Sequence, residues 1–301
     1  MTKSWQQIDL VRGGEGVTIE DSPLGGPILR LTSAGGVAEV ALQGAQLMSW
    51  SPKGHAPVIW LSPVERLGTL KPVRGGTPVC WPWFANHPTD ASKPAHGFVR
   101  TRKWSCDGVA KSDAGVRVFL KTSTTEADRL LWPHTANVVL VVTLGATLQL
   151  EMTTRNKGTD AFALTQALHT YFAVGDISDV TVEGFNGRSY LDKLDDNARK
   201  QQSGDIAFTA EVDRIYDEHT GTADIVDRGL KRRIEITKTG SHSTVVWNPW
   251  SGKAARMGDM GPDGWRRMVC VETCNAGDDI VRLAPGAAHT LTAEYRVTAL
   301  G

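Results

Sequence analysis

Short stretches in which apolar and polar residues alternate run through the whole chain and constrain its fold more than any other feature. Between residues 147 and 153, and again between 290 and 297, every second residue is apolar. A period of two is typical of a half-buried β-strand. Similar short segments, separated by clusters of Gly, Pro, Asn and Asp, occupy 28–31, 37–42, 116–120, 138–144, 233–237 and 243–247. The chain is therefore predicted to fold mainly from strands.

Helical patterns are scarce. Residues 126–132, just before Pro133, and residues 252–257 are the two candidates, and each allows only a turn or two. No long amphipathic helix follows any strand, which argues against parallel βαβ units and a doubly wound nucleotide-binding fold. The 301 residues contain no low-complexity linker or internal repeat, and all-β domains often exceed 200 residues. We predict an all-β protein, a large antiparallel β-sandwich with few short helices, forming one domain over residues 1–301.

Charge and hydropathy exclude several classes of function. Lys plus Arg and Asp plus Glu number 33 each, and the basic residues form no tract of the kind that nucleic acid or anionic membranes attract. The N-terminal MTKSWQQIDL has no apolar segment of a signal peptide, and no stretch approaches the roughly 18 apolar residues of a membrane span. We expect a cytoplasmic monomer without nucleic-acid or membrane partners.

The four cysteines do not indicate a metal site or a disulfide framework. Only Cys270 and Cys274 are close, at a C-x3-C spacing without a second pair, so buried free thiols are the favoured interpretation. Nucleotide-binding, metalloprotease, EF-hand and G-x-S-x-G signatures are absent from the sequence. Acid/base chemistry on side chains remains the open enzymatic possibility.

One stretch, KPVRGGTPVCWPWFANHP at 71–88, is typical of a pocket wall rather than a strand. Its glycine pair allows close backbone approach, its prolines stiffen the segment, and Arg74 offers a planar guanidinium to an anion. Because no broad basic surface exists, the anion is expected to be small and locally bound. Trp81 and Trp83 either line the groove or belong to the core.

Two polar residues stand where strands bury apolar groups. Alternation over 161–172, AFALTQALHTYF, places His169 on a face with small residues, which leaves room for a ligand above the imidazole; a structural histidine is the alternative. In RMVCVETCN, Glu272 shares a face with Met268, Cys270 and Cys274. Burial there would raise the pKa of its carboxyl toward that of a useful general base, whereas an exposed edge-strand glutamate would have no such role.

Several motifs occur together and in order. They are LQGAQLMSW (42–50), RGGTPVCWPWF (74–84), PAHGFVRTRKW (94–104), ALHTYF (167–172), TVVWNPW (244–250), MVCVETCNA (268–276) and LAPG (283–286). In this combination the chain resembles the hexose-6-phosphate mutarotases, also called glucose-6-phosphate 1-epimerases, of the galactose-mutarotase-like superfamily. The resemblance runs from residue 42 to the end and implies the β-supersandwich fold of that superfamily.

The resemblance also implies roles for individual residues. Glu272 would be the general base and His169 the general acid of pyranose ring opening, and neither a metal nor an organic cofactor would be needed. Arg74 and Arg100 would bind the 6-phosphate of a sugar phosphate. An ion pair is the alternative for both arginines.

The same resemblance suggests four less specific contacts. His96 would contact the sugar near its ring oxygen, and Asp192 in SYLDKL would bind sugar hydroxyls. Gln43 and Asn248 are further candidates for hydroxyls, with hydrogen bonds at turns or strand ends as the alternative. Cys274, directly beyond the proposed base, would neighbour the site and make it sensitive to thiol reagents. A mutarotase for unphosphorylated aldoses and a non-catalytic phosphosugar-binding protein are the competing functions.

Overall fold

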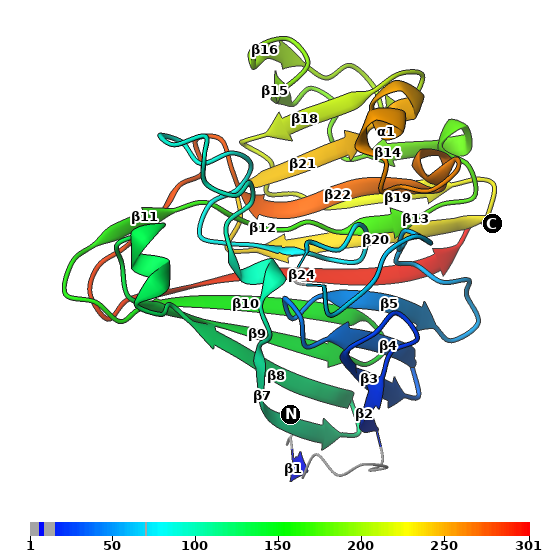
Figure 1. Ribbon diagram of the computed structural model, residues 1–301. Helices are drawn as coiled ribbons and strands as arrows, with labels where there is room; N and C mark the ends of the chain where they lie inside the picture. The colour runs from blue at the N-terminus through cyan, green and yellow to red at the C-terminus, as the bar shows by residue number, and fades with distance from the viewer. Residues whose placement is uncertain (1–5, 9–15, 70) are drawn as a thin grey trace.

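The fold of the protein is given by a computed structural model that describes residues 6–8, 16–69 and 71–301 (Figure 1). Most of the N-terminal segment considered above for a signal peptide lies outside these residues. Every ladder between the described strands is antiparallel. The predicted all-β antiparallel class is confirmed.

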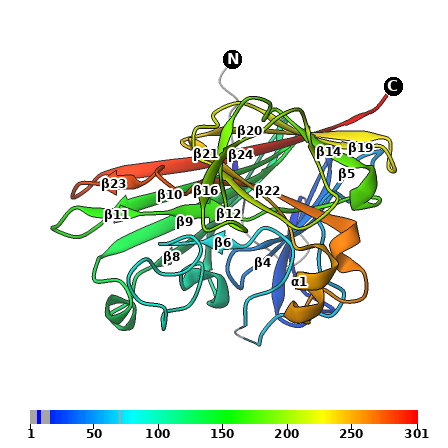
Figure 2. The ribbon, with the colours of Figure 1, turned by 90° about the horizontal axis from the view of Figure 1, so that it is seen from above.

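Two large sheets form most of the molecule. The ten-stranded sheet has the order β1 (Gln6–Ile8), β7 (Ser105–Ser112), β8 (Gly115–Ser123), β9 (Ala136–Leu144), β10 (Leu148–Asn156), β24 (Ala288–Ala299), β20 (Arg232–Thr239), β19 (Ala223–Asp227), β14 (Val180–Glu183) and β17 (Ile206–Ala207). The eight-stranded sheet has the order β16 (Ala198–Gln201), β15 (Ser189–Asp192), β18 (Val212–Tyr216), β21 (Ser243–Asn248), β22 (Met268–Asn275), β12 (Gln166–Leu168) and β6 (Val79–Cys80), with β13 (Tyr171–Ala173) also paired to β22. Figure 2 shows the long strand β24 crossing the molecule beside β10 and β20.

Smaller elements complete the described chain. A four-stranded sheet contains β2 (Val17–Asp21), β3 (Pro27–Ser33), β4 (Gly36–Ala41) and β5 (Leu47–Pro52), and β11 (Phe162–Leu164) pairs with β23 (Val281–Leu283). The helices are α1 (Trp250–Met257) and the 3-10 turns η1 (Val99–Thr101), η2 (Ala127–Leu130), η3 (Ile177–Asp179) and η4 (Gly264–Arg267). Within the described ranges no helix is long and apolar enough to cross a membrane.

The alternation seen in the sequence accounts for most of these elements. All eight predicted strand segments coincide to within one residue with parts of strands, namely β3, β4, β8, β9, β10, β20, β21 and β24. The predicted helical segment 126–132 contains η2, and the segment 252–257 lies within α1, which begins two residues earlier. One prediction needs correction, because residues 161–172 form the three strands β11, β12 and β13 rather than one. The backbone N–H of His169 bonds to the carbonyl of Pro78, and that of Tyr171 to Gly76, so the loop at 76–78 interrupts the regular ladder.

The eight-stranded sheet has two different faces. One face packs into the main core, to which β22 contributes Val269 and Val271. The opposite face carries a second apolar cluster that includes Tyr171, Trp247 and Cys270. The predicted alternation of β22 is thus confirmed, and Glu272 lies on the face with the second cluster.

The tryptophans of the 71–88 stretch belong to the main core rather than to a groove wall. Trp81 and Trp83 are 1% and 4% exposed. The indole N–H of Trp81 donates to Thr154 Oγ1 at 3.0 Å, and that of Trp83 donates to the carbonyl of Pro94 at 2.9 Å. They anchor the stretch, which leaves its arginine and glycines free to shape a pocket.

Candidate active site

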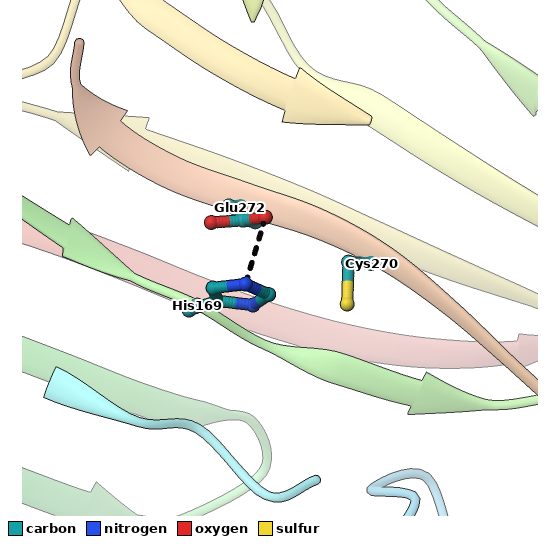
Figure 3. A group of neighbouring side chains, drawn as sticks. All are labelled: His169, Cys270 and Glu272. Atoms are coloured by element: carbon teal, nitrogen blue, oxygen red, sulfur yellow. Dashed lines mark ion pairs between the residues drawn. The ribbon is translucent and has the colours of Figure 1, made fainter. Parts of the chain in front are cut away.

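His169, between β12 and β13, lies opposite Glu272 on β22. Leu168 pairs with Thr273 and Tyr171 with Cys270, and the same antiparallel register places His169 across from Glu272. His169 Nε2 is 3.4 Å from Glu272 Oε1 (Figure 3). Both residues are buried, with exposures of 8% and 1%. The two expected catalytic side chains are therefore brought together.

The pair has spare hydrogen-bonding capacity in an environment that disfavours charge. Neither His169 Nδ1 nor Glu272 Oε2 has a hydrogen-bond partner among the described residues. Burial raises the pKa of Glu272 well above its usual value, and the nearby carboxylate of Asp213 adds to the shift. Burial also lowers the pKa of His169, with further contributions from His96, Arg74 and Arg100. A carboxylic acid beside a neutral imidazole holds one exchangeable proton, which is what acid/base chemistry requires.

Aromatic side chains fix the plane of the His169 ring. Tyr171 stacks on it with centroids 4.8 Å apart and an interplanar angle of 7°, while Trp247 meets it edge-on at 6.0 Å. The ring of His96 contacts it in a T-shaped arrangement at 5.6 Å. The imidazole is consequently held in one orientation toward Glu272.

A cavity of about 670 Å³ opens beside His169. Its lining contains the cationic side chains Arg66, Lys71, Arg74 and Arg100, the acidic side chains Glu65 and Asp259, and also His96, His169 and Tyr171. A larger hollow of about 900 Å³ lies between hairpin turns near 34–35, 113–114 and 145–146, and its described lining contains no histidine or cysteine. The smaller cavity is therefore the better candidate for the active site.

Arg74 reaches this cavity from the glycine-rich turn. Its Nε and Nη2 donate to Asp259 Oδ2 at 3.1 and 2.9 Å, and its Nη1 donates to the Tyr171 hydroxyl at 2.8 Å. The turn needs its glycines because a Cβ on Gly76, where φ is +68°, would lie 2.4 Å from the carbonyl oxygen of Leu47. The ion-pair alternative holds for Arg74, although two of its five N–H groups remain available.

Arg100 has a different environment. It lies in η1 and its Nη2 donates to the carbonyl of Ala95 at 2.9 Å. No carboxylate of the described residues forms an ion pair with Arg100, and burial lowers the pKa of its guanidinium. A partly buried cation without a counter-ion is costly, so this position favours an incoming anion.

His96 lines the same cavity as a neutral hydrogen-bond donor. Its Nδ1 accepts the backbone N–H of Ala85 at 3.2 Å, which leaves the proton of the neutral ring on Nε2. Burial, together with Arg100 and Arg74, lowers the pKa of His96 to about 3. The ring therefore stays uncharged at physiological pH and can donate to a ligand oxygen.

Two expected contact residues, Asp192 and Asn248, do not line the cavity. Asp192 binds Lys200 Nζ at 2.7 Å and caps the backbone N–H of Leu194 at 3.0 Å. The Asn248 amide donates to the carbonyls of Trp265 and Met268, both at 2.8 Å. In each case the polar group already has partners inside the protein.

Gln43 and Cys274 also take other roles. The Gln43 side chain bridges the backbone of Gly68 and Lys71, both at 2.9 Å, and so supports a segment that lines the cavity. Cys274 shares the face of Glu272 as predicted, but it is 0% exposed and burial raises the pKa of its thiol to about 12. A protonated, enclosed thiol is poorly reactive toward thiol reagents.

Sequence reasoning missed three residues of the site. Tyr171 could have been found from alternation, because it is two residues beyond His169. Asp259 is 185 residues from Arg74 along the chain, and no local pattern connects them. Asp213 lies opposite Trp247, which in turn lies opposite Cys270, so its effect on Glu272 depends on the pairing of three strands.

Comparison with known proteins gives one consistent result. The family described as aldose 1-epimerase matches residues 27–296. A protein of Salmonella typhimurium named "Putative glucose-6-phosphate 1-epimerase" is 37% identical over 240 residues, which is 79% of this chain and 80% of that protein. A protein of the same name from Cenchrus ciliaris is 37% identical over 259 residues, 83% of this chain and 78% of its own.

Solved structures agree with these relatives. A crystal structure titled as a "putative mutarotase" from Salmonella typhimurium superimposes with a TM-score of 0.88 at 30% identity, covering 98% of this chain and 97% of the other. A "Putative aldose 1-epimerase" from Escherichia coli K12 gives a TM-score of 0.70 at 17% identity, covering 95% and 100%, and shows a common fold.

Proposed function

The chain belongs to the aldose 1-epimerase family, and on this premise we propose that it interconverts the α and β anomers of a hexose 6-phosphate. Family membership makes the protein an epimerase acting on a small sugar. Glucose 6-phosphate is the first candidate because the relatives at 37% identity carry that substrate in their names. The observation that carries the phosphate assignment is Arg100, a partly buried cation with no ion-pair partner among the described residues, in the cavity beside His169.

Ring opening follows from one base and one acid. Glu272 accepts the proton of the anomeric hydroxyl while the C1 carbonyl forms and the bond from C1 to the ring oxygen breaks. His169 donates a proton to the ring oxygen. Rotation about the C1–C2 bond of the open-chain aldehyde, followed by the reverse transfers on its other face, gives the second anomer and restores both side chains. Atoms and protons balance without a metal or an organic cofactor.

The protonation states are consistent with this direction of transfer. Burial favours the single proton on Glu272, but moving that proton to His169 keeps the total charge of the pair unchanged. A bound sugar brings hydroxyl groups that can bond to Glu272 Oε2 and His169 Nδ1, which have no partners now. Hydrogen bonds to the charged forms favour the ionised pair that the reaction needs. Because Glu272 is only 1% exposed, the sugar must displace side chains that cover it.

The two arginines would hold the phosphate at the cavity wall. Arg100 supplies an uncompensated guanidinium, and Arg74 supplies the N–H groups that Asp259 and Tyr171 do not use. Charge-assisted hydrogen bonds of this kind contribute roughly 1.5–3 kcal/mol each. His96 would donate its Nε2 proton to a sugar oxygen.

The phosphate assignment is tested with Arg100→Gln. We expect KM for glucose 6-phosphate to rise about 10- to 100-fold, from the loss of a charged hydrogen bond, while the slow turnover of free glucose changes little. Lys103→Gln is the matched control, because it removes the same charge from an exposed residue that does not line the cavity. Equal KM values in the two variants would reject the phosphate contact.

A further inference from the structure

Cys270 belongs to the same buried cluster as His169 and Glu272, although the proposed reaction does not use it. Figure 3 shows Cys270 and Glu272 on β22, with the thiol and the carboxylate on the side of the His169 imidazole. The Cys270 thiol sulfur, a His169 ring nitrogen and a Glu272 carboxylate oxygen all lie within 4.8 Å of one another. Exposures of 0%, 8% and 1% place all three in the interior.

The strand ladder fixes this grouping. Cys270 and Glu272 are two residues apart on one strand, so their side chains share a face. His169 lies across from Glu272, in the break between β12 and β13, and both of those strands pair with β22. The three side chains therefore start from a rigid backbone, and only rotations about their side-chain bonds are needed to bring them closer.

Each of the three residues has an unused ligand atom. His169 Nδ1 and Glu272 Oε2 are buried without hydrogen-bond partners, and within the described ranges the Cys270 sulfur forms no hydrogen bond. Buried polar atoms are usually satisfied, so two unpartnered ones in a cluster that also contains a thiol indicate a place for a ligand. An imidazole, a thiolate and a carboxylate together are the donor set that Zn²⁺ and similar borderline-soft cations prefer.

We propose that His169, Cys270 and Glu272 form an inhibitory binding site for a divalent cation of this class, with Zn²⁺ as the first candidate. Bond lengths of about 2.0–2.3 Å place the ligand atoms of a tetrahedral zinc site about 3.3–3.7 Å apart. From their limit of 4.8 Å, the ligand atoms here need to approach one another by at most about 1.5 Å. Of the three residues, His169 lines the cavity, so a water from the cavity would supply the fourth ligand.

The charge of the occupied site suits its surroundings. Binding releases one proton from the Cys270 thiol and one from the Glu272 carboxyl to solvent, and the imidazole is already neutral. A divalent cation with one thiolate and one carboxylate has no net charge, so Arg74 and Arg100 do not repel it as they would a bare cation. Because binding releases these two protons, the affinity for the cation increases as the pH rises.

The ion would act as an inhibitor rather than a cofactor. Proton transfer uses the lone pairs of His169 and Glu272, and those same lone pairs would be bound to the metal. This consequence rests on the proposed function, whereas metal binding itself does not.

Metal binding is tested first without any activity measurement. Co²⁺ is titrated into the chelator-treated full-length protein, and we expect one equivalent to give the near-ultraviolet thiolate band and the visible bands of a four-coordinate site. Zn²⁺ should displace these bands. Cys270→Ala should abolish the thiolate band, and Cys106→Ala, which removes a half-buried thiol of β7, should retain it. Absence of a thiolate band in the parent protein, or its persistence in Cys270→Ala, would overturn the proposal.

A second experiment follows anomer exchange with Zn²⁺ present. Each protein is compared with its own uninhibited rate, and we expect Cys270→Ala to need at least tenfold more Zn²⁺ for half inhibition than the parent protein. Addition of a chelator should restore the parent rate. Cobalt binding without inhibition would retain the metal site but contradict the proposed acid/base roles, so the two failures are distinguishable.

Discussion

His169 lies directly opposite Glu272 across the pairing of β12 and β13 with β22, and its Nε2 is 3.4 Å from Glu272 Oε1. The carboxyl is nearly inaccessible, and the imidazole is held between Tyr171 and Trp247. This relationship joins an acid and a base in surroundings that exclude water, beside a cavity rich in cations.

Glu272→Gln should remove the general base while keeping the shape of the site. We expect kcat for anomer exchange to fall by about 10²–10⁴-fold, the usual contribution of a positioned acid or base. Binding of the sugar phosphate, measured by calorimetry, should change little because the arginines are untouched. Turnover within a factor of ten of the parent enzyme would remove Glu272 from the base role.

The pH dependence of kcat/KM should show a plateau through neutral pH. At low pH the imidazole of His169 takes up a second proton for the His169–Glu272 pair. This protonation occurs only well below pH 6.5, the ordinary pKa of histidine, because burial and the neighbouring His96, Arg74 and Arg100 lower the pKa of His169. Glu272 loses the last proton only above its usual range, because burial and Asp213 raise its pKa. The value of kcat/KM should therefore decline only below pH 6.5 and should persist toward alkaline pH.

Glucose 6-sulfate is the substrate to use for this profile, since a phosphate monoester titrates on its own near pH 6. An acid limb centred between about 6 and 7 with the sulfate would indicate an ordinary histidine pKa. That result would contradict the effect of burial on His169.

Asp259→Asn tests whether Asp259 positions Arg74. Asp259 binds the Nε and Nη2 edge of the guanidinium, so its loss should let Arg74 rotate away from the cavity. We expect KM for the sugar phosphate to rise about three- to tenfold with little change in kcat, in line with roughly 1 kcal/mol for a partly exposed ion pair. Asp263→Asn, an identical change in the same loop without an ion pair among the described residues, is the control. A lower KM would instead mean that Asp259 competes with the phosphate.

Arg232 should be required for stability rather than catalysis. It is 2% exposed and donates to the carbonyls of Ala56, Pro57 and Ala173, the last at the end of β13. Its Nε also lies 3.8 Å from Oδ2 of the buried Asp227. Arg232→Met would leave the three carbonyls and this carboxylate without their cation, and we expect the free energy of unfolding in urea to fall by about 3–5 kcal/mol.

The neighbouring Arg233→Met provides the comparison for Arg232. Arg233 is partly exposed, with a side-chain exposure of 34%, and it pairs with Glu183 and Asp224. Its loss should cost about 1 kcal/mol or less. Equal losses for the two variants would argue against a special structural role of Arg232.

Local patterns predicted much of the fold and the central pair of the site. Alternation is a local property, so strands such as β10 and β24, and the face of β22 that carries Glu272, could be predicted from sequence. The break at His169 could not, because the loop at 76–78 supplies the backbone partners of residues 169–171. Tertiary contacts of this kind leave no trace in a local pattern.

Of the polar residues expected to bind the sugar phosphate, some line the cavity and others bind partners inside the protein. Arg74, His96 and Arg100 lie in one short region of sequence and reach one cavity. Asp192 and Asn248 carry polar side chains that could bind sugar hydroxyls. In the structure, however, Asp192 already binds a lysine and Asn248 already donates to backbone carbonyls. Sequence identifies a side chain that can bind a ligand but does not reveal which internal partner has already bound it.

The central claim is tested most directly by magnetisation-transfer NMR of glucose 6-phosphate, with and without the protein, beside free glucose and galactose under identical conditions. We predict faster exchange between the anomers of the phosphorylated sugar and much weaker acceleration of the free sugars. Equal acceleration of all three sugars would contradict the phosphate clamp, and no acceleration of any of them would contradict the acid/base roles of His169 and Glu272.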